Sequence, residues 1–147
     1  MTARYVKPTG MDAVFNGAVG WFTKLGLPLA GSRVLSVQGR TSGEWRSTPV
    51  NPIRIGGERY LVSPRGHTQW VRNIRVSGAG RLASGRRVEE FRVEEVADGQ
   101  KPPILRAYLK AWAWEVGRFF ENVDKDSPDE RLREIAPDFP VFRIITT

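Results

Sequence analysis

The fold is decided by residues 33–63, which read RVLSVQGRTSGEWRSTPVNPIRIGGERYLVS. Residues 33–38 alternate Val, Leu and Val with polar neighbours, which is typical of a strand. Residues 45–55 predict a second strand, and this one contains Pro49 and Pro52. Because proline cannot donate a ladder hydrogen bond, these prolines indicate a sheet edge or a bulge, where backbone groups are free to meet a ligand.

Hairpin signals continue along the chain. Gly56-Gly57 predicts a two-residue hairpin turn, and residues 58–63 return as a strand. Residues 79–84 and 87–97 predict another hairpin around Gly85. Antiparallel hairpins of this number favour a closed or split barrel, so the sequence predicts a mainly β (α+β) fold.

Helical periodicity flanks this β-region. Residues 103–120 carry the strongest helical pattern, and Thr68 is the expected N-cap of a short helix over 68–76. The remaining expected elements are a loose leader over 1–10, a helix over 11–25, a short helix with Ser127 as N-cap, Pro128 at its first position and Glu130 completing a capping box, and a strand over 140–145. We therefore expect one domain over residues 1–147, a barrel with flanking N-terminal and C-terminal helices.

Composition excludes several kinds of site. The 147 residues include no cysteine, which excludes disulfides, thiolate metal sites and a cysteine nucleophile, and which fits a cytoplasmic protein. The single histidine, His67, argues against a histidine-rich metal site, and beside a turn it is expected to be a surface or capping residue. No apolar run approaches the roughly 20 residues that span a bilayer, and no signal peptide is recognised.

The positive charge is concentrated in one third of the chain. Residues 38–87 contain ten arginines, two acids and no lysine, whereas the rest of the chain is close to neutral. Arginine without lysine favours bidentate recognition of phosphate or carboxylate. The alternative is a solvated basic face, which composition alone leaves open.

Two polar clusters lie in this arginine-rich segment. Residues 39–49 (GRTSGEWRSTP) combine two arginines, hydroxyls and glycines, and successive N–H groups in such a turn can form an anion nest. Residues 66–75 (GHTQWVRNIR) place Arg72 and Arg75 on one helical face with Asn73 between them. Either cluster also suits an ordinary turn or an ordinary helix.

Together and in this order, the two clusters resemble the deazaflavin-dependent nitroreductase family. That family comprises actinobacterial reductases that use coenzyme F420, within the split β-barrel flavin-binding superfamily. The resemblance covers about residues 11–97, and the closing Val-Phe-Arg-Ile is also similar to the ends of family members. It implies a split antiparallel β-barrel that transfers a hydride from the reduced deazaflavin to an activated double bond, a quinone or a nitro group. No catalytic acid–base group or metal is expected, since the cofactor supplies the difficult chemistry.

The resemblance also implies a set of site residues. The phosphate and the acidic tail of the cofactor would be held by Arg40, Ser42, Arg46, Ser47 and Thr48. Beside the ring and the tail would lie Trp70, Asn73 and Arg75, and Val62 to Gly66 would border the ring. The expected cofactor-binding residues are Arg40, Thr41, Ser42, Gly43, Arg46, Ser47, Thr48, Pro49, Val62, Ser63, Pro64, Gly66, Trp70, Asn73 and Arg75. Tyr108, Trp112 and Trp114 are expected to wall a substrate pocket, although packing in the helix core is the alternative for Trp112. At the position of Thr41, members of the family often have a lysine.

The sequence is also compatible with other functions. An FMN- or haem-binding relative could use the same barrel, since FMN also needs a phosphate clamp. A nucleic-acid-binding barrel is less favoured, because aromatic residues for stacking are sparse in the arginine-rich segment. Weak peripheral membrane contact through residues 11–25 is a third possibility, although that segment has a poor basic face. The protein is expected to act on a small-molecule acceptor as a monomer or homodimer.

Overall fold

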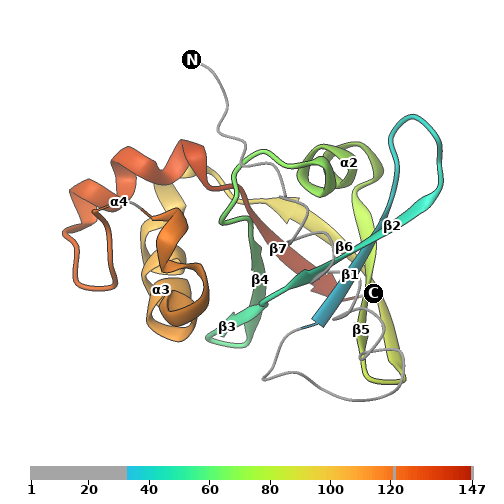
Figure 1. Cartoon of the computed structure of the whole chain (residues 1–147), viewed down its shortest axis with the longest axis horizontal. Coiled ribbons are helices and arrows are strands. Elements are labelled where there is room, and N and C mark those ends of the chain that lie inside the picture. Colours follow the sequence, from blue (N-terminus) through green and yellow to red (C-terminus); the bar gives the residue numbers. More distant parts are fainter. Residues whose placement is uncertain (1–32, 121, 147) are drawn as a thin grey trace.

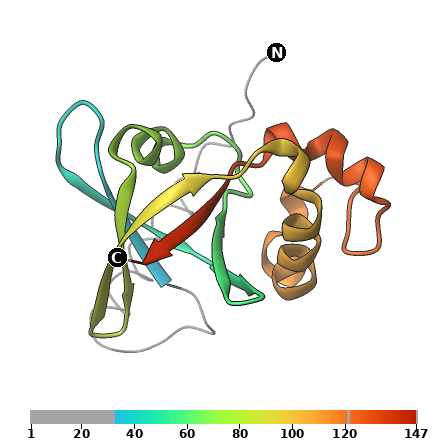
Figure 2. The ribbon, with the colours of Figure 1, turned by 180° about the vertical axis from the view of Figure 1, so that it is seen from behind.

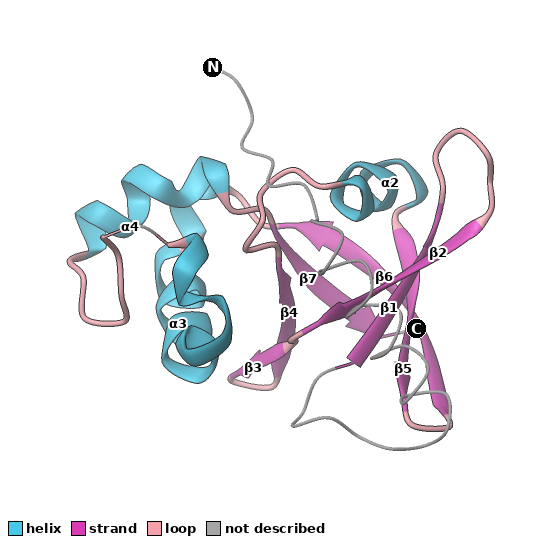
Figure 3. Cartoon of the chain, viewed as in Figure 1, coloured by secondary structure: helices cyan, strands magenta, loops and turns pink. Residues whose placement is uncertain are grey.

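The computed structural model describes residues 33–120 and 122–146. Seven strands form one sheet in which every neighbouring pair is antiparallel (Figures 1 and 3). The strands are β1 (Arg33–Gln38), β2 (Trp45–Val50), β3 (Ile53–Ile55), β4 (Glu58–Val62), β5 (Ala79–Ser84), β6 (Arg87–Glu95) and β7 (Val141–Thr146). The helices are α2 (Gln69–Ser77), α3 (Pro102–Val116) and α4 (Asp129–Ile135), with the 3-10 turns η1 (Asp98–Gln100), η2 (Gly117–Phe119) and η3 (Ala136–Asp138). The expected mainly β (α+β) class is confirmed.

The strand order shows why the sheet must curl. The order is β2-β1-β5-β6-β7-β4-β3, so β2 and β3 lie at opposite edges although only Asn51 and Pro52 separate them in sequence. Six spacings of about 4.8 Å would make a flat sheet about 29 Å wide. The short link reaches only about 10 Å, so the two edges must come close together. No ladder joins β2 to β3 within the part of the chain that the structure describes, which leaves a split barrel with a seam at this link.

Two cores lie on either side of the wall formed by β4 and β7. Successive residues of a strand point to opposite faces, so Leu61 and Phe142 pack inside the barrel whereas Val62 and Val141 pack outward. The inner core also contains Ile74 of α2. The outer core lies against α3 and α4, which stand together beside β3 and β4 (Figure 2). Adjacent apolar pairs in the sequence therefore mark a wall that is buried on both faces.

Several expected boundaries are confirmed, and the strand over 45–55 is corrected. Gly56 and Gly57 adopt φ angles of 56° and 86°, as the hairpin turn requires. The segment 45–55 is two strands, because Asn51 and Pro52 break it, and the two pieces take the two edges of the sheet. The proline signal for an edge is therefore confirmed.

The C-terminal helices also differ in detail from the expectation. The helix expected over 103–120 ends at Val116 and continues as the 3-10 turn η2 from Gly117, a residue that weakens a helix. Pro128, not Ser127, is the N-cap of α4, and it makes no side-chain cap bond. The hydroxyl of Ser127 instead accepts a hydrogen bond from the backbone N–H of Asp124 at 2.9 Å. The predicted capping box is therefore wrong.

Some expectations lie outside the described residues. The leader over 1–10 and the helix over 11–25 belong to this group. Among the helices that are described, none has the length and apolar character needed to cross a bilayer. Within the same residues, no group of three His, Asp or Glu side chains is arranged to hold a metal ion.

Candidate functional site

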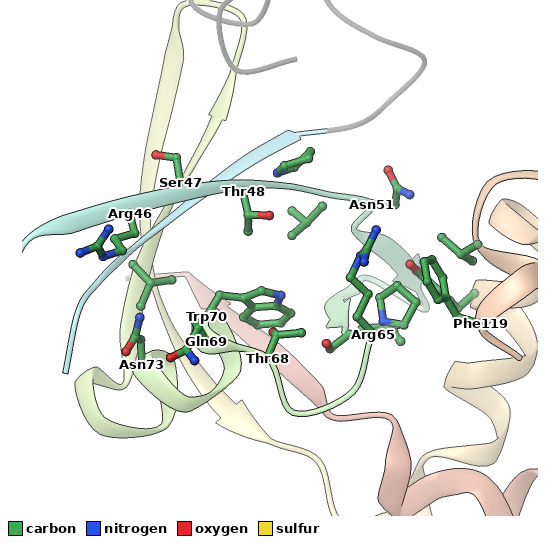
Figure 4. Close-up of a pocket in the computed structure, with 18 of the residues that line it drawn as sticks. Arg46, Ser47, Thr48, Asn51, Arg65, Thr68, Gln69, Trp70, Asn73 and Phe119 are labelled. Atoms are coloured by element: carbon green, nitrogen blue, oxygen red, sulfur yellow. The ribbon is translucent and has the colours of Figure 1, made fainter. Parts of the chain in front are cut away.

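A cavity of about 450 Å³ lies where the inner and outer cores meet (Figure 4). Strand β2 and the link at Asn51 form one wall, α2 with the loop before it forms another, and α3 with η2 closes the third side. The expected site residues that line the cavity are Arg46, Ser47, Thr48, Pro49, Val62, Ser63, Pro64, Trp70, Asn73 and Tyr108. Segments far apart in sequence thus contribute to one cavity.

Other expected residues lie outside this cavity. Those that do not line it are Arg40, Thr41, Ser42, Gly43, Gly66, Arg75, Trp112 and Trp114. The lining also contains residues that no sequence pattern singled out for the site, namely Val37, Val50, Asn51, Gln69, Val116, Arg118 and Phe119. Thr68, which was expected only as a helix cap, lines the cavity as well. Arg65 also lines it and belongs to the segment from Val62 to Gly66 that was expected to border the ring. The prolines around Asn51 were a usable signal, whereas Arg118 and Phe119 reach the cavity only through tertiary packing.

Strand β2 presents the polar end of the cavity. Arg46 is 67% exposed at its side chain, and its ion pair with Glu44 is loose, at 4.0 Å. The hydroxyl of Ser47 is bonded across the ladder to that of Ser36 at 2.8 Å. In Figure 4 the hydroxyl of Thr48 points into the cavity beside Trp70, whereas that of Ser47 points away. Arg46 and Thr48 are therefore the two β2 side chains best placed to donate to a ligand.

Three backbone amides of the turn between β1 and β2 already form hydrogen bonds within the turn. The N–H of Gly39 donates to the carbonyl of Glu44 at 2.8 Å, and that of Gly43 donates to the carbonyl of Gly39 at 2.9 Å. The N–H of Glu44 donates to the hydroxyl of Ser42 at 3.1 Å. Since these amides are occupied, the turn does not present them as the anion nest that its composition suggested.

Arg40 reaches across to α2. Its backbone N–H and its guanidinium both donate to Asn73 Oδ1, at 3.1 and 2.8 Å, and the guanidinium also donates to Gln69 Oε1 at 2.9 Å. These bonds turn the amide oxygen of the buried Asn73 toward Arg40. The amide nitrogen then lies on the side of Arg46 (Figure 4). Arg40 therefore orients two amide side chains that line the cavity.

Hydrogen bonds fix the loop from Ser63 to Thr68. The buried Ser63 hydroxyl donates to the carbonyl of Gly66 at 2.5 Å, and the Thr68 N–H donates to the same carbonyl at 2.9 Å. Gly66 has a φ of 88°, a conformation that favours glycine. The loop is thereby a rigid base for the cavity residues Pro64 and Arg65.

His67 joins this loop to the C-terminal region. Its Nδ1 lies 3.0 Å from a guanidinium nitrogen of Arg75, which can only donate, so Nδ1 accepts. Its Nε2 therefore carries the proton and donates to the carbonyl of Pro137 at 2.9 Å. Arg75 in turn forms two bonds to Glu95, at 2.9 and 2.6 Å. Both residues tie elements together, away from the cavity lining.

Of the aromatic residues expected at the site, some line the cavity and others pack in the outer core or lie exposed. Trp70 lies against Phe142, with ring centroids 5.7 Å apart, and presents its remaining surface to the cavity. Tyr108 is buried and lines the cavity. Trp112 packs against the outer core, which agrees with the alternative of core packing given for it above, and Trp114 is 73% exposed. Only Tyr108 of the three aromatic residues expected at the substrate is therefore at the cavity.

The chemistry of the lining suits an anionic, flat cofactor. The lining carries three arginines, Arg46, Arg65 and Arg118, and no Asp or Glu among the described residues. Figure 4 shows Trp70 and apolar side chains between Arg46 and Arg65. A phosphate-bearing ring needs this combination of a cationic end and an apolar slot.

The fold and the site together define the class: a split-barrel protein with a pocket for a phosphate-bearing, flavin-like cofactor. The family model for F420H(2)-dependent quinone reductases matches residues 12–129. The chain therefore belongs to the F420H(2)-dependent quinone reductase family. It is an F420H2-dependent oxidoreductase, its cofactor is coenzyme F420, and the resemblance seen in the two sequence clusters is confirmed.

Solved structures of similar fold agree with this architecture. A chain described as a domain-swapped dimer is 14% identical, with a TM-score of 0.57 over 92% of this chain and 99% of that one. The F420-H2 dependent reductase FDR-A is 15% identical, with a TM-score of 0.52 over 78% and 93%. The conserved hypothetical protein Rv2991 from Mycobacterium tuberculosis is 15% identical, with a TM-score of 0.53 over 99% and 84%. These likenesses concern the fold alone. No curated protein matches the chain.

Proposed function

We propose that the acceptor is a flat, mainly apolar small molecule with an activated double bond, a quinone or a nitro group. The observation that carries this proposal is the division of the cavity into a cationic end at β2 and an apolar middle beside Trp70 and Tyr108. Bound F420H2 supplies a hydride. The role of the chain is then to orient the two reactants and to exclude water from the apolar middle.

We further propose how this chain holds the cofactor. Arg46 and Thr48 donate to its phosphate and acidic tail, with Asn73 Nδ2 as a further donor from α2. Trp70 borders its ring together with Val62 to Arg65, the part of the expected segment Val62 to Gly66 that lines the cavity. The charge in this region supports the proposal, because an anionic cofactor is drawn to a net positive surface.

Arg40 receives an indirect role in this proposal. It is bonded to Asn73 and Gln69 and lies outside the cavity lining, so it positions these amides for the cofactor. Arg75 acts in a similar way through His67 and the loop that precedes α2. For Thr41, Ser42, Gly43, Gly66, Trp112 and Trp114, no direct ligand contact is proposed.

We also propose a domain organisation, a compartment and an assembly state for the protein. Residues 1–147 form one split-barrel domain that works in the cytoplasm as a monomer or a homodimer. The similar fold of a chain described as a domain-swapped dimer supports the second state. The absence of cysteine from the sequence agrees with a reducing compartment.

Cofactor binding and turnover test the proposal directly. Fluorescence titration of the protein with oxidised F420, beside FMN, should give saturable binding of F420 and weaker binding of FMN, which lacks the acidic tail. F420H2 mixed with a panel of quinones, enones and nitroaromatics should then be reoxidised in the presence of the protein. If no acceptor in the panel accelerates reoxidation although F420 binds, the proposed acceptor class is wrong.

A further inference from the structure

We propose that Arg65 is a catalytic residue, whose guanidinium stabilises the acceptor oxygen that becomes negative when a carbonyl or quinone is reduced. This inference rests on the proposed function, because it assigns a role within hydride transfer to a carbonyl-bearing acceptor. It gives the second cationic end of the cavity a task separate from holding the cofactor phosphate.

Arg65 lies at the far side of the cavity from Arg46. Figure 4 shows its side chain between Asn51 and Phe119, with the apolar middle of the cavity separating it from Arg46. Two cationic ends around an apolar middle therefore suit two negative groups, one on the cofactor and one that forms on the acceptor.

Both the backbone and the guanidinium of Arg65 are held by neighbouring groups. Its base is in the loop that the Ser63 hydroxyl closes through the carbonyl of Gly66. Its head lies over the ring of Phe119, with Cζ 4.8 Å from the ring centroid. A charge held in advance costs little reorganisation when a negative oxygen forms beside it, which is the basis of electrostatic catalysis.

A second cation shares the same ring. Arg118 Cζ lies 4.6 Å from the Phe119 centroid and Arg65 Cζ lies 4.8 Å from it, so the two carbons are at most 9.4 Å apart, the sum of these distances. Both residues line the cavity, Arg65 as the less exposed of the two. Two guanidinium groups on one ring thus place cationic side chains at this end of the cavity, where the described lining carries no Asp or Glu.

The step balances without a proton donor from the protein. Addition of one hydride to a quinone or an enone forms a bond to hydrogen and moves two electrons into the acceptor, which leaves one oxygen with a negative charge. That oxygen later takes a proton from water. Arginine stays protonated under these conditions, so Arg65 acts as a fixed positive charge and not as an acid.

Binding of two matched ligands to the protein saturated with oxidised F420 tests the proposal without turnover. The neutral ligand is 1,4-naphthoquinone, and the anionic ligand is its 2-hydroxy derivative, which is ionised at neutral pH and mimics the half-reduced acceptor. Arg65→Met should weaken the anionic ligand by about tenfold or more and the neutral ligand by less than about twofold. Arg65→Lys, which keeps the charge but loses the planar fork, should recover part of the loss.

Kinetics and a control variant complete the experiment. With 1,4-naphthoquinone as acceptor, Arg65→Met should lower kcat by about 10²-fold, the usual scale for one lost oxyanion contact. KM and the F420 affinity should change little. Arg92→Met removes the same charge from an exposed position of β6 outside the cavity, and it should leave every readout unchanged.

The failures of the two proposals are distinguishable. If wild-type protein binds F420 but reduces no quinone, the proposed function fails. If wild-type protein is active and Arg65→Met leaves the ratio of anionic to neutral affinity unaltered, only the role of Arg65 is overturned. Loss of F420 affinity in Arg65→Met would instead assign this arginine to the cofactor.

Discussion

Thr68 offers a substitution that should make the protein more stable, because its side chain carries a buried hydroxyl. Its side chain is 8% exposed, and its buried hydroxyl oxygen has no hydrogen-bond partner among the residues that the structure describes. It occupies the N-cap of α2 but makes no side-chain cap bond, so Thr68→Val removes no helix cap. Within the described part of the chain, Thr68→Val therefore breaks no side-chain hydrogen bond and removes the cost of burying an unpaired hydroxyl.

The magnitude follows from two contributions. A buried polar group without a partner costs about 1–3 kcal/mol, and a methyl group in its place gains about 0.8 kcal/mol by burial. Allowing for partial relief of the hydroxyl by local motion, Thr68→Val should stabilise the protein by about 1–2 kcal/mol. For a chain of this size that corresponds to a rise in Tm of roughly 3–6 °C.

Urea unfolding monitored by tryptophan fluorescence measures this change. The control is Thr68→Ser, which keeps the hydroxyl and loses the methyl group, and which should destabilise the protein by about 1 kcal/mol. A loss of stability in Thr68→Val would refute the reasoning, because it would mean that the hydroxyl caps α2 or has another partner. Weaker F420 binding by the more stable variant would identify the cofactor as the missing partner, since Thr68 lines the cavity.

Three further substitutions test the site and the scaffold. Arg46→Ala should weaken F420 binding by about 1–3 kcal/mol, because its pair with Glu44 is too loose to compete; unchanged affinity in a fluorescence titration, with the fold intact, would remove Arg46 from the site. The hydrogen bond from Arg59 holds the pKa of Glu89 below its usual value, so Glu89 stabilises the fold above the ordinary carboxyl pKa of about 4.3 and this contribution is lost as the pH falls through the lower folded value. Glu89→Gln should therefore cost up to about 1 kcal/mol in urea unfolding near neutral pH and less near pH 3, and a cost that grows on acidification would contradict this sign. Lys101 is 3% exposed and its Nζ donates to a backbone carbonyl of η3 at 2.9 Å, so Lys101→Met should lower stability by about 1–3 kcal/mol; a thermal unfolding midpoint that does not move would show that this buried contact is dispensable.

Local signals in the sequence predicted most of the sheet. The glycine pair at 56–57 and the turn at Gly85 need only their own backbone conformation, so the hairpins around them were predictable. The prolines beside Asn51 indicated a sheet edge, but they did not indicate that the strand would divide into two strands at opposite edges. That β2 and β3 separate to opposite edges depends on pairings of β4 with β7 and of β1 with β5, which no local pattern encodes.

The site was less predictable, for a related reason. Sequence motifs placed Arg40 among the cofactor contacts, yet its hydrogen bonds run to Asn73, which is 33 residues away and on another element. Arg118 and Phe119 carry no motif and enter the cavity only because α3 packs against β3 and β4. Residue type in a motif indicates what can bind, whereas long-range packing decides which side chains face the ligand.

The two-residue link between the sheet edges also has a thermodynamic consequence. One wall of the cavity is built from Thr48 to Asn51 on one margin of the split, and the opposite wall is carried by the helical region beside β3 and β4. A molecule that contacts both walls bridges the split in the barrel. Because part of its binding free energy then holds the two edges together, ligand binding should stabilise the closed form of the split.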